Sequence, residues 1–190
     1  MTKFCLSIST IPQRYNTIYK TIESLLNQTL LPHKIIINYS DKYLRFPDEK
    51  INHNELFKKN YDDKILFNKS EDYGPGTKLL GSLKQIKDCQ YIILLDDDHI
   101  YKKNMLEIFA TKTDLKSYNA YSFCTYSIED LVIGQGADGF MIRTDLLKNI
   151  EEFFNKYVKN NKSLFLNDDL WISIYINKIL KKKIINLDNY

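Results

Sequence analysis

Short apolar runs alternate along the chain with longer segments in which apolar residues recur three and four positions apart. Runs of this length predict buried strands, and they fall at residues 4–9, 34–38, 65–67, 91–95, 120–125, 140–143 and 184–187. The helical spacing predicts helices over residues 16–26, 77–87, 104–112 and 144–159 and from 167 or 168 to 181. Residues 41–63 are polar and irregular. The alternation predicts an α/β domain with a mostly parallel sheet, whose ligands bind at the carboxyl ends of the strands.

The glycines mark two loops. All 6 glycines fall within residues 74–81 and 134–139. Glycine lets the backbone turn sharply or approach a ligand closely. We therefore expect these two segments either to shape a site or to form ordinary turns.

Composition narrows the class of protein. The 190 residues are 44% hydrophobic and 27% charged, as in a globular protein of one domain rather than a disordered chain. No apolar run approaches the roughly 20 residues of a membrane helix, and the first residues do not have the pattern of a signal peptide. The 3 cysteines form an odd set without CxxC spacing. We expect neither a disulfide framework nor a zinc site, and hence a reducing, cytoplasmic location.

The formal charge of +3 rests on lysines that are spread along the whole chain. A nucleic-acid-binding surface usually gathers Lys and Arg on one face, so we expect no nucleic-acid partner. The one short run, at residues 181–183, predicts at most a weak peripheral contact with an anionic membrane.

Three consecutive acids follow the most apolar strand. Asp96, Asp97 and Asp98 come directly after YIILL. Strand geometry would point Asp96 and Asp98 the same way and Asp97 the opposite way. Carboxylates this close repel one another unless a cation compensates, and hard oxygen ligands suit Mg²⁺ or Mn²⁺. The triplet therefore predicts a metal site that grips a diphosphate; the alternative is an acidic loop that caps the next helix.

Other chemistries do not fit the motifs. Residues 74–78 lack the spacing of a phosphate-binding P-loop, and no EF-hand loop or nucleophile elbow is present. Residues 99–103 also lack the Thr- and Gly-rich turn of a phosphoribosyltransferase.

A second acidic pair, Asp168 and Asp169, opens the last predicted helix. Acids in a first turn complement the helix dipole, so helix capping is one interpretation. Combined with a metal site in the same domain, a separate carboxylate suits sugar transfer to a hydroxyl. The metal stabilises the leaving diphosphate and the carboxylate accepts the proton of the attacking hydroxyl.

Four segments in order resemble a nucleotide-sugar glycosyltransferase of the GT-A fold, close to the family 2 type. They are FCLSISTIPQR at 4–14, EDYGPGTKLL at 71–80, YIILLDDD at 91–98, and GQGADGFMIR at 134–143 followed by NDDLW at 167–171. The resemblance implies a Rossmann-like three-layer sandwich in one domain over residues 1–190. Its nucleotide-binding part would cover about 1–98 and its acceptor-side part about 99–190.

The resemblance also implies a role for individual residues. Asp96 and Asp98 would bind the metal, and Asp169 or Asp168 would be the base, with Asp169 preferred. Nucleotide contacts are expected from Thr10, Pro12, Arg14, Asp41, Lys78, Asp96 and Asp97. Acceptor-side contacts are expected from Gly76, Asp138, Gly139 and Trp171, although Trp171 at helical spacing also suits a core position.

The implied reaction is a metal-dependent, inverting transfer of a hexosyl or deoxyhexosyl group. The donor would be a nucleoside-diphosphate sugar, with UDP favoured, and the acceptor a hydroxyl of a glycan or glycolipid in glycan synthesis. No histidine follows His99, so the metal would depend on aspartates, phosphates and water. The chain ends soon after the acidic pair, which fits either a compact enzyme or one domain of a longer protein.

Two alternatives remain open. One is a non-catalytic nucleotide-sugar or carbohydrate-binding domain, in which Asp168 and Asp169 only cap a helix. The other is a sugar nucleotidyltransferase, which normally has a Gly-rich N-terminal loop, whereas residues 9–14 contain no glycine.

Overall fold

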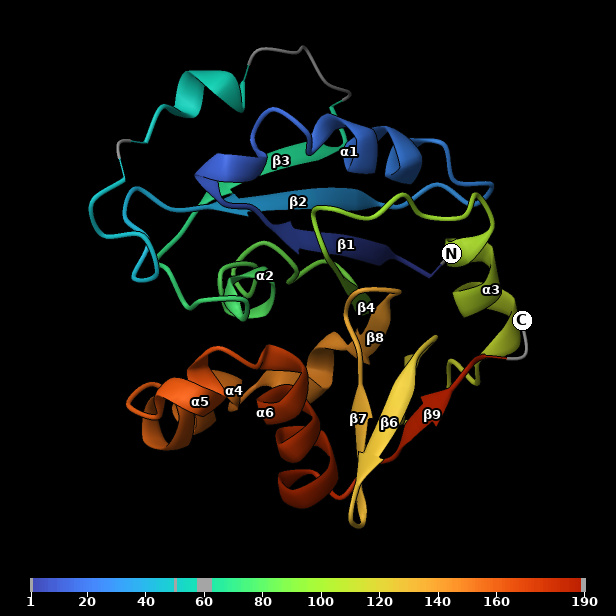
Figure 1. Cartoon of the computed structure of the whole chain (residues 1–190). Coiled ribbons are helices and arrows are strands. Elements are labelled where there is room, and N and C mark those ends of the chain that lie inside the picture. Colours follow the sequence, from blue (N-terminus) through green and yellow to red (C-terminus); the bar gives the residue numbers. More distant parts are fainter. Residues whose placement is uncertain (1, 50, 58–62, 189–190) are drawn as a thin grey trace.

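The computed structural model describes residues 2–49, 51–57 and 63–188. Within them a seven-stranded sheet has the order β3-β2-β1-β4-β8-β5-β9 (Figure 1). Its strands are β1 (Phe4–Ser9), β2 (Lys34–Tyr39), β3 (Ile65–Lys69), β4 (Tyr91–Leu95), β5 (Ala120–Ser122), β8 (Phe140–Arg143) and β9 (Ile184–Asn186). The first four are parallel, β8 is antiparallel to β4 and β5, and β9 is parallel to β5. The predicted mostly parallel sheet is confirmed.

Helices cover both faces of this sheet, which makes three layers. The hydrophobic core cluster on one face of the sheet includes side chains of α1 (Tyr19–Leu26) and α3 (Met105–Lys112). The cluster on the other includes α2 (Thr77–Leu80), α4 (Ile150–Phe153) and α6 (Asp168–Ile174), with α5 (Lys162–Phe165) packed against it. Short 3₁₀ turns lie at Pro12–Arg14, His53–Glu55 and Thr144–Leu147, and π-helical turns at Phe154–Val158 and Tyr175–Ile179.

Strand β4 shows why the sheet is buried on both faces. All of its residues are buried, and alternate side chains belong to opposite core clusters. Ile93 and Leu95 pack with α1 and α3, whereas Ile92 and Leu94 pack with the α2, α4 and α6 side. A continuous apolar run is what such a position requires.

A buried polar network ties α2 to the sheet. Ser7 Oγ on β1 donates to the carbonyl of Lys78 at 2.5 Å. Asn38 Nδ2 on β2 donates to Ser7 Oγ at 3.0 Å and to Ser82 Oγ at 2.8 Å. Asn68 Nδ2 donates to Asn38 Oδ1 at 2.8 Å. Satisfied buried networks fix a unique arrangement, so Lys78 is held at a defined place above β1.

Several boundaries differ from the sequence-based expectation. The helix expected over 77–87 is α-helical only to Leu80, because the following turns carry Ser82 into the buried network. The helices expected over 144–159 and 167–181 are divided by 3₁₀ and π turns. Within the irregular segment 41–63, residues 50 and 58–62 lie outside the described residues.

The hairpin of β6 (Thr125–Ile128) and β7 (Leu131–Gly134) was not predicted. Its turn contains Glu129 in a left-handed conformation with φ of 52°, a position where glycine or asparagine is usual. Tyr126 and Ile128 on β6 are exposed, so its pattern does not have the alternation of a half-buried strand.

The cysteine prediction was wrong for two residues. Cys5 on β1 and Cys89 just before β4 form a disulfide, with Cα atoms 6.0 Å apart, while Cys124 is free. The two residues are 84 positions apart in sequence, and only the β1–β4 pairing makes them neighbours. The cytoplasmic location, which rested on reduced cysteines, stays a prediction without that support.

No helix of the described residues is long and apolar enough to cross a membrane.

Candidate active site

A cleft of about 300 Å³ opens at the carboxyl ends of β1 and β4. Parallel strands direct their following loops to one edge of the sheet, where α/β folds bind ligands. Eight of the expected site residues line it: Thr10, Arg14, Lys78, Asp96, Asp97, Asp98, Asp168 and Asp169. The structure thus brings together the two acidic regions, which are 70 residues apart in the chain.

The three acids after β4 differ in exposure. The side chain of Asp97 is 3% exposed, whereas those of Asp96 and Asp98 are 34% and 44% exposed. Burial raises the pKa of Asp97 above its usual range, and the adjacent Arg14 guanidinium opposes that shift. Arg14 pairs with Asp97 and, at 2.9 Å from Nη2 to Oδ2, with Asp98. The turn that follows β4 therefore buries Asp97 and leaves Asp96 and Asp98 open to the cleft, as the sequence predicted, although these residues no longer belong to the strand.

The open acids fit a divalent metal. Ligand atoms of Asp96, Asp98 and His99 all lie within 4.8 Å of one another, a spacing that one ion can bridge. His99 Nδ1 is 3.1 Å from Asp98 Oδ1. Carboxylate oxygens and an imidazole nitrogen suit Mn²⁺, and carboxylates suit Mg²⁺. Sequence reasoning did not assign His99 to the metal, because it sought a histidine further along the chain.

Lys78 joins the two acidic regions. Its side chain is 5% exposed, and Nζ pairs with Asp96 and lies 3.2 Å from Asp168 Oδ2. Burial by itself would lower the pKa of Lys78, but the charges of Asp168 and Asp96 outweigh it and raise that pKa above its ordinary value. Lys78 is therefore a fixed cation, placed by α2 between Asp96 and the start of α6.

The second acidic pair does not cap its own helix. Asn167 takes that place, because its Oδ1 accepts the Leu170 N–H at 3.2 Å. Asp169 Oδ1 instead accepts the Gly136 N–H at 2.9 Å. Burial, together with the charge of Asp168, raises the pKa of Asp169 to about 7. A carboxyl that titrates near neutral pH and faces a cleft has the properties of a general base.

Tyr101, which sequence reasoning missed, joins two loops of the site. It is 7% exposed. Its hydroxyl accepts the Asp96 N–H at 2.8 Å and lies within hydrogen-bond distance of the carbonyls of Asp96 at 3.1 Å and Ala137 at 3.0 Å. The loop of Ala137 begins at Gly136, whose amide holds Asp169. One buried hydroxyl thus links the loop of the three acids to the loop whose Gly136 amide holds Asp169.

Two expected nucleotide contacts do not line the cleft. Asp41 lines a separate hollow, where it pairs with Lys69 and, at 3.1 Å, with His53 Nε2. Pro12 opens the short 3₁₀ turn that carries Arg14. Its ring fixes φ at the start of that turn, so Pro12 acts on the cleft through Arg14.

Gly76 and Trp171 pack against each other in the core. Trp171 is fully buried, and its ring meets Phe154 edge to face with centroids 5.6 Å apart. A Cβ on Gly76 would lie 2.8 Å from Trp171 Cζ2. Because protein covers both ring faces, the expected stacking of Trp171 on a sugar is corrected to a core role, as its helical spacing also allowed.

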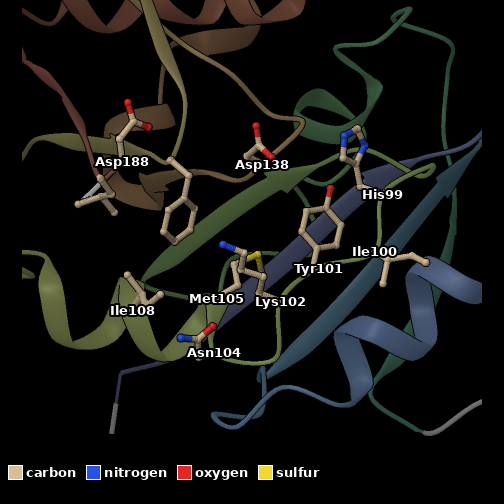
Figure 2. Close-up of a pocket in the computed structure, with 11 residues that line it drawn as sticks. His99, Ile100, Tyr101, Lys102, Asn104, Met105, Ile108, Asp138 and Asp188 are labelled. Atoms are coloured by element: carbon tan, nitrogen blue, oxygen red, sulfur yellow. The ribbon is translucent and has the colours of Figure 1, made fainter. Parts of the chain in front are cut away.

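Asp138 and Gly139 lie on the same loop as Gly136, further from Asp169. Gly139 has a φ of 117°, which requires glycine, and its N–H donates to the Gly136 carbonyl at 3.1 Å. That tight turn directs Asp138 into a second cavity (Figure 2) rather than into the cleft.

Comparison with solved structures supports the GT-A fold. Residues 1–349 of TarS from S. aureus are 16% identical, with a TM-score of 0.59 over 90% of this chain and 56% of that one. The mannosyltransferase PcManGT from Pyrobaculum calidifontis, in complex with GDP-Man and Mn²⁺, is 12% identical, with a TM-score of 0.64 over 97% and 54%. The chain therefore spans about half the length of these two proteins.

A synthase also has a similar fold. The 4-diphosphocytidyl-2C-methyl-D-erythritol synthase from Anaerococcus prevotii is 12% identical, with a TM-score of 0.59 over 100% of this chain and 89% of that one. No curated protein sequence matches the chain. The family model for glycosyl transferase family 2, however, matches residues 9–184, and the chain is therefore a member of glycosyl transferase family 2.

Proposed function

We propose that this protein is a metal-dependent, inverting glycosyltransferase that moves a sugar from a nucleoside-diphosphate sugar to an acceptor hydroxyl. One observation carries the proposal: a single cleft contains the open carboxylates of Asp96 and Asp98 and, apart from them, the half-buried carboxyl of Asp169. A transferase of this kind needs both a site for the diphosphate and a separate proton acceptor.

The donor side of the cleft carries fixed cations beside the metal ligands. A Mn²⁺ or Mg²⁺ ion held by Asp96, Asp98 and His99 would supply positive charge to the leaving diphosphate. Arg14 stands beside them with its side chain 40% exposed. A guanidinium has five N–H donors, so Arg14 can pair with Asp97 and Asp98 and still bind a phosphate oxygen. The ion pair between Lys78 and Asp96 orients the Asp96 carboxylate.

Asp169 is the proposed base. An ionised Asp169 takes the proton of the acceptor hydroxyl as that oxygen forms a bond to the anomeric carbon. The bond from that carbon to the diphosphate oxygen breaks, and the electron pair leaves with the nucleotide. Attack from the face opposite the diphosphate inverts the configuration. The Gly136 N–H orients the carboxylate, while Asp168 is engaged with Lys78.

The substrates are proposed more coarsely. The related structures of TarS and PcManGT are described as complexes with UDP-GlcNAc and with GDP-Man and Mn²⁺. We favour a UDP sugar with a hexosyl or deoxyhexosyl group, and a glycan or glycolipid acceptor. Tyr43 and Arg45 line the cleft together with Thr10. We propose that these two side chains contact the nucleoside of the donor.

The nucleotidyltransferase alternative has one observation in its favour, namely the fold match over the whole chain. Against it, the loop after β1, from Ser9 to Arg14, contains no glycine. The two reactions are distinguishable by their products, since a nucleotidyltransferase releases pyrophosphate and a glycosyltransferase releases a nucleoside diphosphate.

A thermal-shift panel of UDP, GDP and CDP, each with and without Mn²⁺, tests the donor site, because a ligand of the folded state raises the melting temperature. We expect one diphosphate to stabilise the protein only when Mn²⁺ is present. Incubation with UDP-GlcNAc or GDP-mannose and Mn²⁺ should then release the nucleoside diphosphate slowly. Asp169→Asn should keep the shift and lose the release, whereas the matched control Asp130→Asn, on the β6–β7 turn, should keep both.

Binding without any release would favour the non-catalytic domain, and release of pyrophosphate from a nucleoside triphosphate and a sugar phosphate would favour the nucleotidyltransferase. A product with retained anomeric configuration, measured by NMR, would contradict inversion.

A further inference from the structure

A second cavity of about 300 Å³ adjoins the cleft across the loop that follows β4. Asp96 to Asp98 line the cleft, while His99, Tyr101 and Asp138 line this cavity. The contact of His99 with Asp98 and the bonds of Tyr101 to Asp96 run through the shared wall. Its volume lies at the lower end of the roughly 300–1,000 Å³ range of small-molecule pockets.

Apolar and polar side chains together line the cavity (Figure 2). Met105 and Ile108 from α3 lie below, and the carboxylates of Asp138 and Asp188 lie above. Phe123 and Leu187 add further apolar surface, and Lys102 and Asn104 add hydrogen-bond donors. Hydroxyl groups need both acceptors and donors, and the C–H face of a pyranose needs an apolar surface.

The cavity is held by fixed contacts on each side. Phe123 packs edge to face on Phe109 of α3, with centroids 4.6 Å apart. The Leu187 N–H donates to the carbonyl of Ser122 at 2.9 Å, which ties the segment after β9 to β5. The Asp188 N–H donates to Asn186 Oδ1 at 2.7 Å. The pocket is therefore preformed, as ligand sites usually are.

We propose that this cavity binds an uncharged sugar unit of the acceptor, and that Asp138 and Asp188 accept its hydroxyl groups. The proposal rests on the proposed function and deepens it by naming the acceptor class. The tight turn from Gly136 to Gly139 places Asp138 within about 7 Å, measured between Cα atoms, of the residue whose amide holds Asp169. A sugar bound in the cavity would thus lie against the loop whose Gly136 amide holds the proposed base.

The charges argue against an anionic acceptor at this position. Two carboxylates face one lysine, Lys102, across the cavity, so a phosphate or a uronate would meet net repulsion. The cations Arg14 and Lys78 lie in the neighbouring cleft and are already paired with aspartates. The acceptor sugar in this cavity is therefore neutral, whereas the anionic part of the donor lies across the wall.

The test uses the whole chain with UDP and Mn²⁺ on an array of immobilised neutral and anionic glycans. We expect binding to neutral glycans, with soluble copies of the best one confirming the affinity by titration. The double variant Asp138→Asn and Asp188→Asn should bind that glycan about 10- to 100-fold more weakly, because the neutral amide oxygens accept hydrogen bonds that are weaker than those to a carboxylate. Asp130→Asn, an exposed acid on the β6–β7 turn, is the matched control and should bind like the wild type.

Three results would overturn the proposal: no glycan bound, the strongest binding to phosphorylated or acidic glycans, or undiminished binding by the double variant. Stabilisation by UDP and Mn²⁺, measured on the same samples, separates this outcome from failure of the proposed function. If the donor shift is present and glycan binding is independent of Asp138 and Asp188, only the acceptor inference fails.

Discussion

The two acidic regions of the cleft contain the same residue type in opposite settings. Asp96 and Asp98 lie on a loop at the end of a strand, and their side chains are 34% and 44% exposed. Asp168 and Asp169 open a helix, and the Asp168 side chain is only 10% exposed. In the first region, Arg14 forms an ion pair with Asp98. In the second, burial and the charge of Asp168 raise the pKa of Asp169 to about 7.

This difference shows how the surroundings of a carboxylate suit it either to metal binding or to proton transfer. Pairs of acids whose surroundings push their pKa values apart serve different chemical roles. The exposed carboxylates of Asp96 and Asp98 are open to a metal ion. A half-buried carboxyl beside another acid, such as Asp169, has a pKa raised to about 7 and can exchange its proton near neutral pH. Lys78 contacts both regions and keeps them at a fixed separation.

Asp169→Asn should have the largest effect, because the amide cannot accept a proton. We expect turnover to fall by roughly 10²- to 10⁴-fold, the usual contribution of a general base, with the affinity for UDP and Mn²⁺ unchanged. Steady-state kinetics and calorimetry measure the two quantities. An equal loss of binding and turnover would break the division of roles between the two acidic regions.

The pH dependence of kcat/KM should follow the ionisation of Asp169. Because the pKa is raised to about 7, the base is protonated and inactive below that pH and ionised above it. We expect kcat/KM to rise about tenfold per pH unit up to about pH 7 and then to level off. His99→Gln, which alters the loop of the three acids and leaves Asp169 in place, is the control. A step that disappears in that variant would assign the pH dependence to the metal loop instead.

Asp98→Asn should weaken binding of the donor nucleotide rather than slow the chemical step. Loss of an ionised ligand should weaken UDP binding in the presence of Mn²⁺ by about 10- to 100-fold. Metal-free UDP binding should stay unchanged, and titration with and without Mn²⁺ measures both. Unaltered metal-dependent binding would remove Asp98 from the metal site.

Tyr101→Phe should have a smaller effect, but one that reduces both the function of the Asp96–Asp98 loop and that of Asp169. The hydroxyl bonds the Asp96 backbone and the Ala137 carbonyl, and its loss should lower the free energy of unfolding by about 1–2 kcal/mol. We expect metal-dependent UDP affinity and turnover each to fall about tenfold. Tyr118→Phe, on an exposed tyrosine, is the control. An effect on stability alone would restrict Tyr101 to a structural role.

The strands that are buried on both faces could be predicted best from the sequence. β1, β4 and β8 begin and end at the expected residues, because a continuous apolar run between polar loops leaves few alternatives. The β6–β7 hairpin could not be predicted, since Tyr126 and Ile128 are exposed and the turn at Glu129 lacks glycine. The Cys5–Cys89 disulfide depends on the pairing of β1 with β4, which sequence spacing does not encode.

The candidate site was predictable where a local rule places the residue. The acids after β4 and at the start of α6, with Arg14 and Lys78, gather at the carboxyl ends of the strands as α/β folds require. Tyr101 was missed because its role depends on the meeting of two loops, and His99 was missed because the metal-binding histidine was sought further along the chain. Trp171 is in the core because Gly76 and Phe154 pack on it, a contact that appears only once the chain is folded.

The most direct test of the two roles is anomalous X-ray scattering at the manganese edge, from crystals of the wild type and of Asp169→Asn grown with Mn²⁺ and UDP. The account predicts one strong peak between Asp96 and Asp98, in contact with the diphosphate, in both proteins. A structure with UDP bound and no manganese at these two aspartates, or with manganese on Asp168 and Asp169, would contradict it.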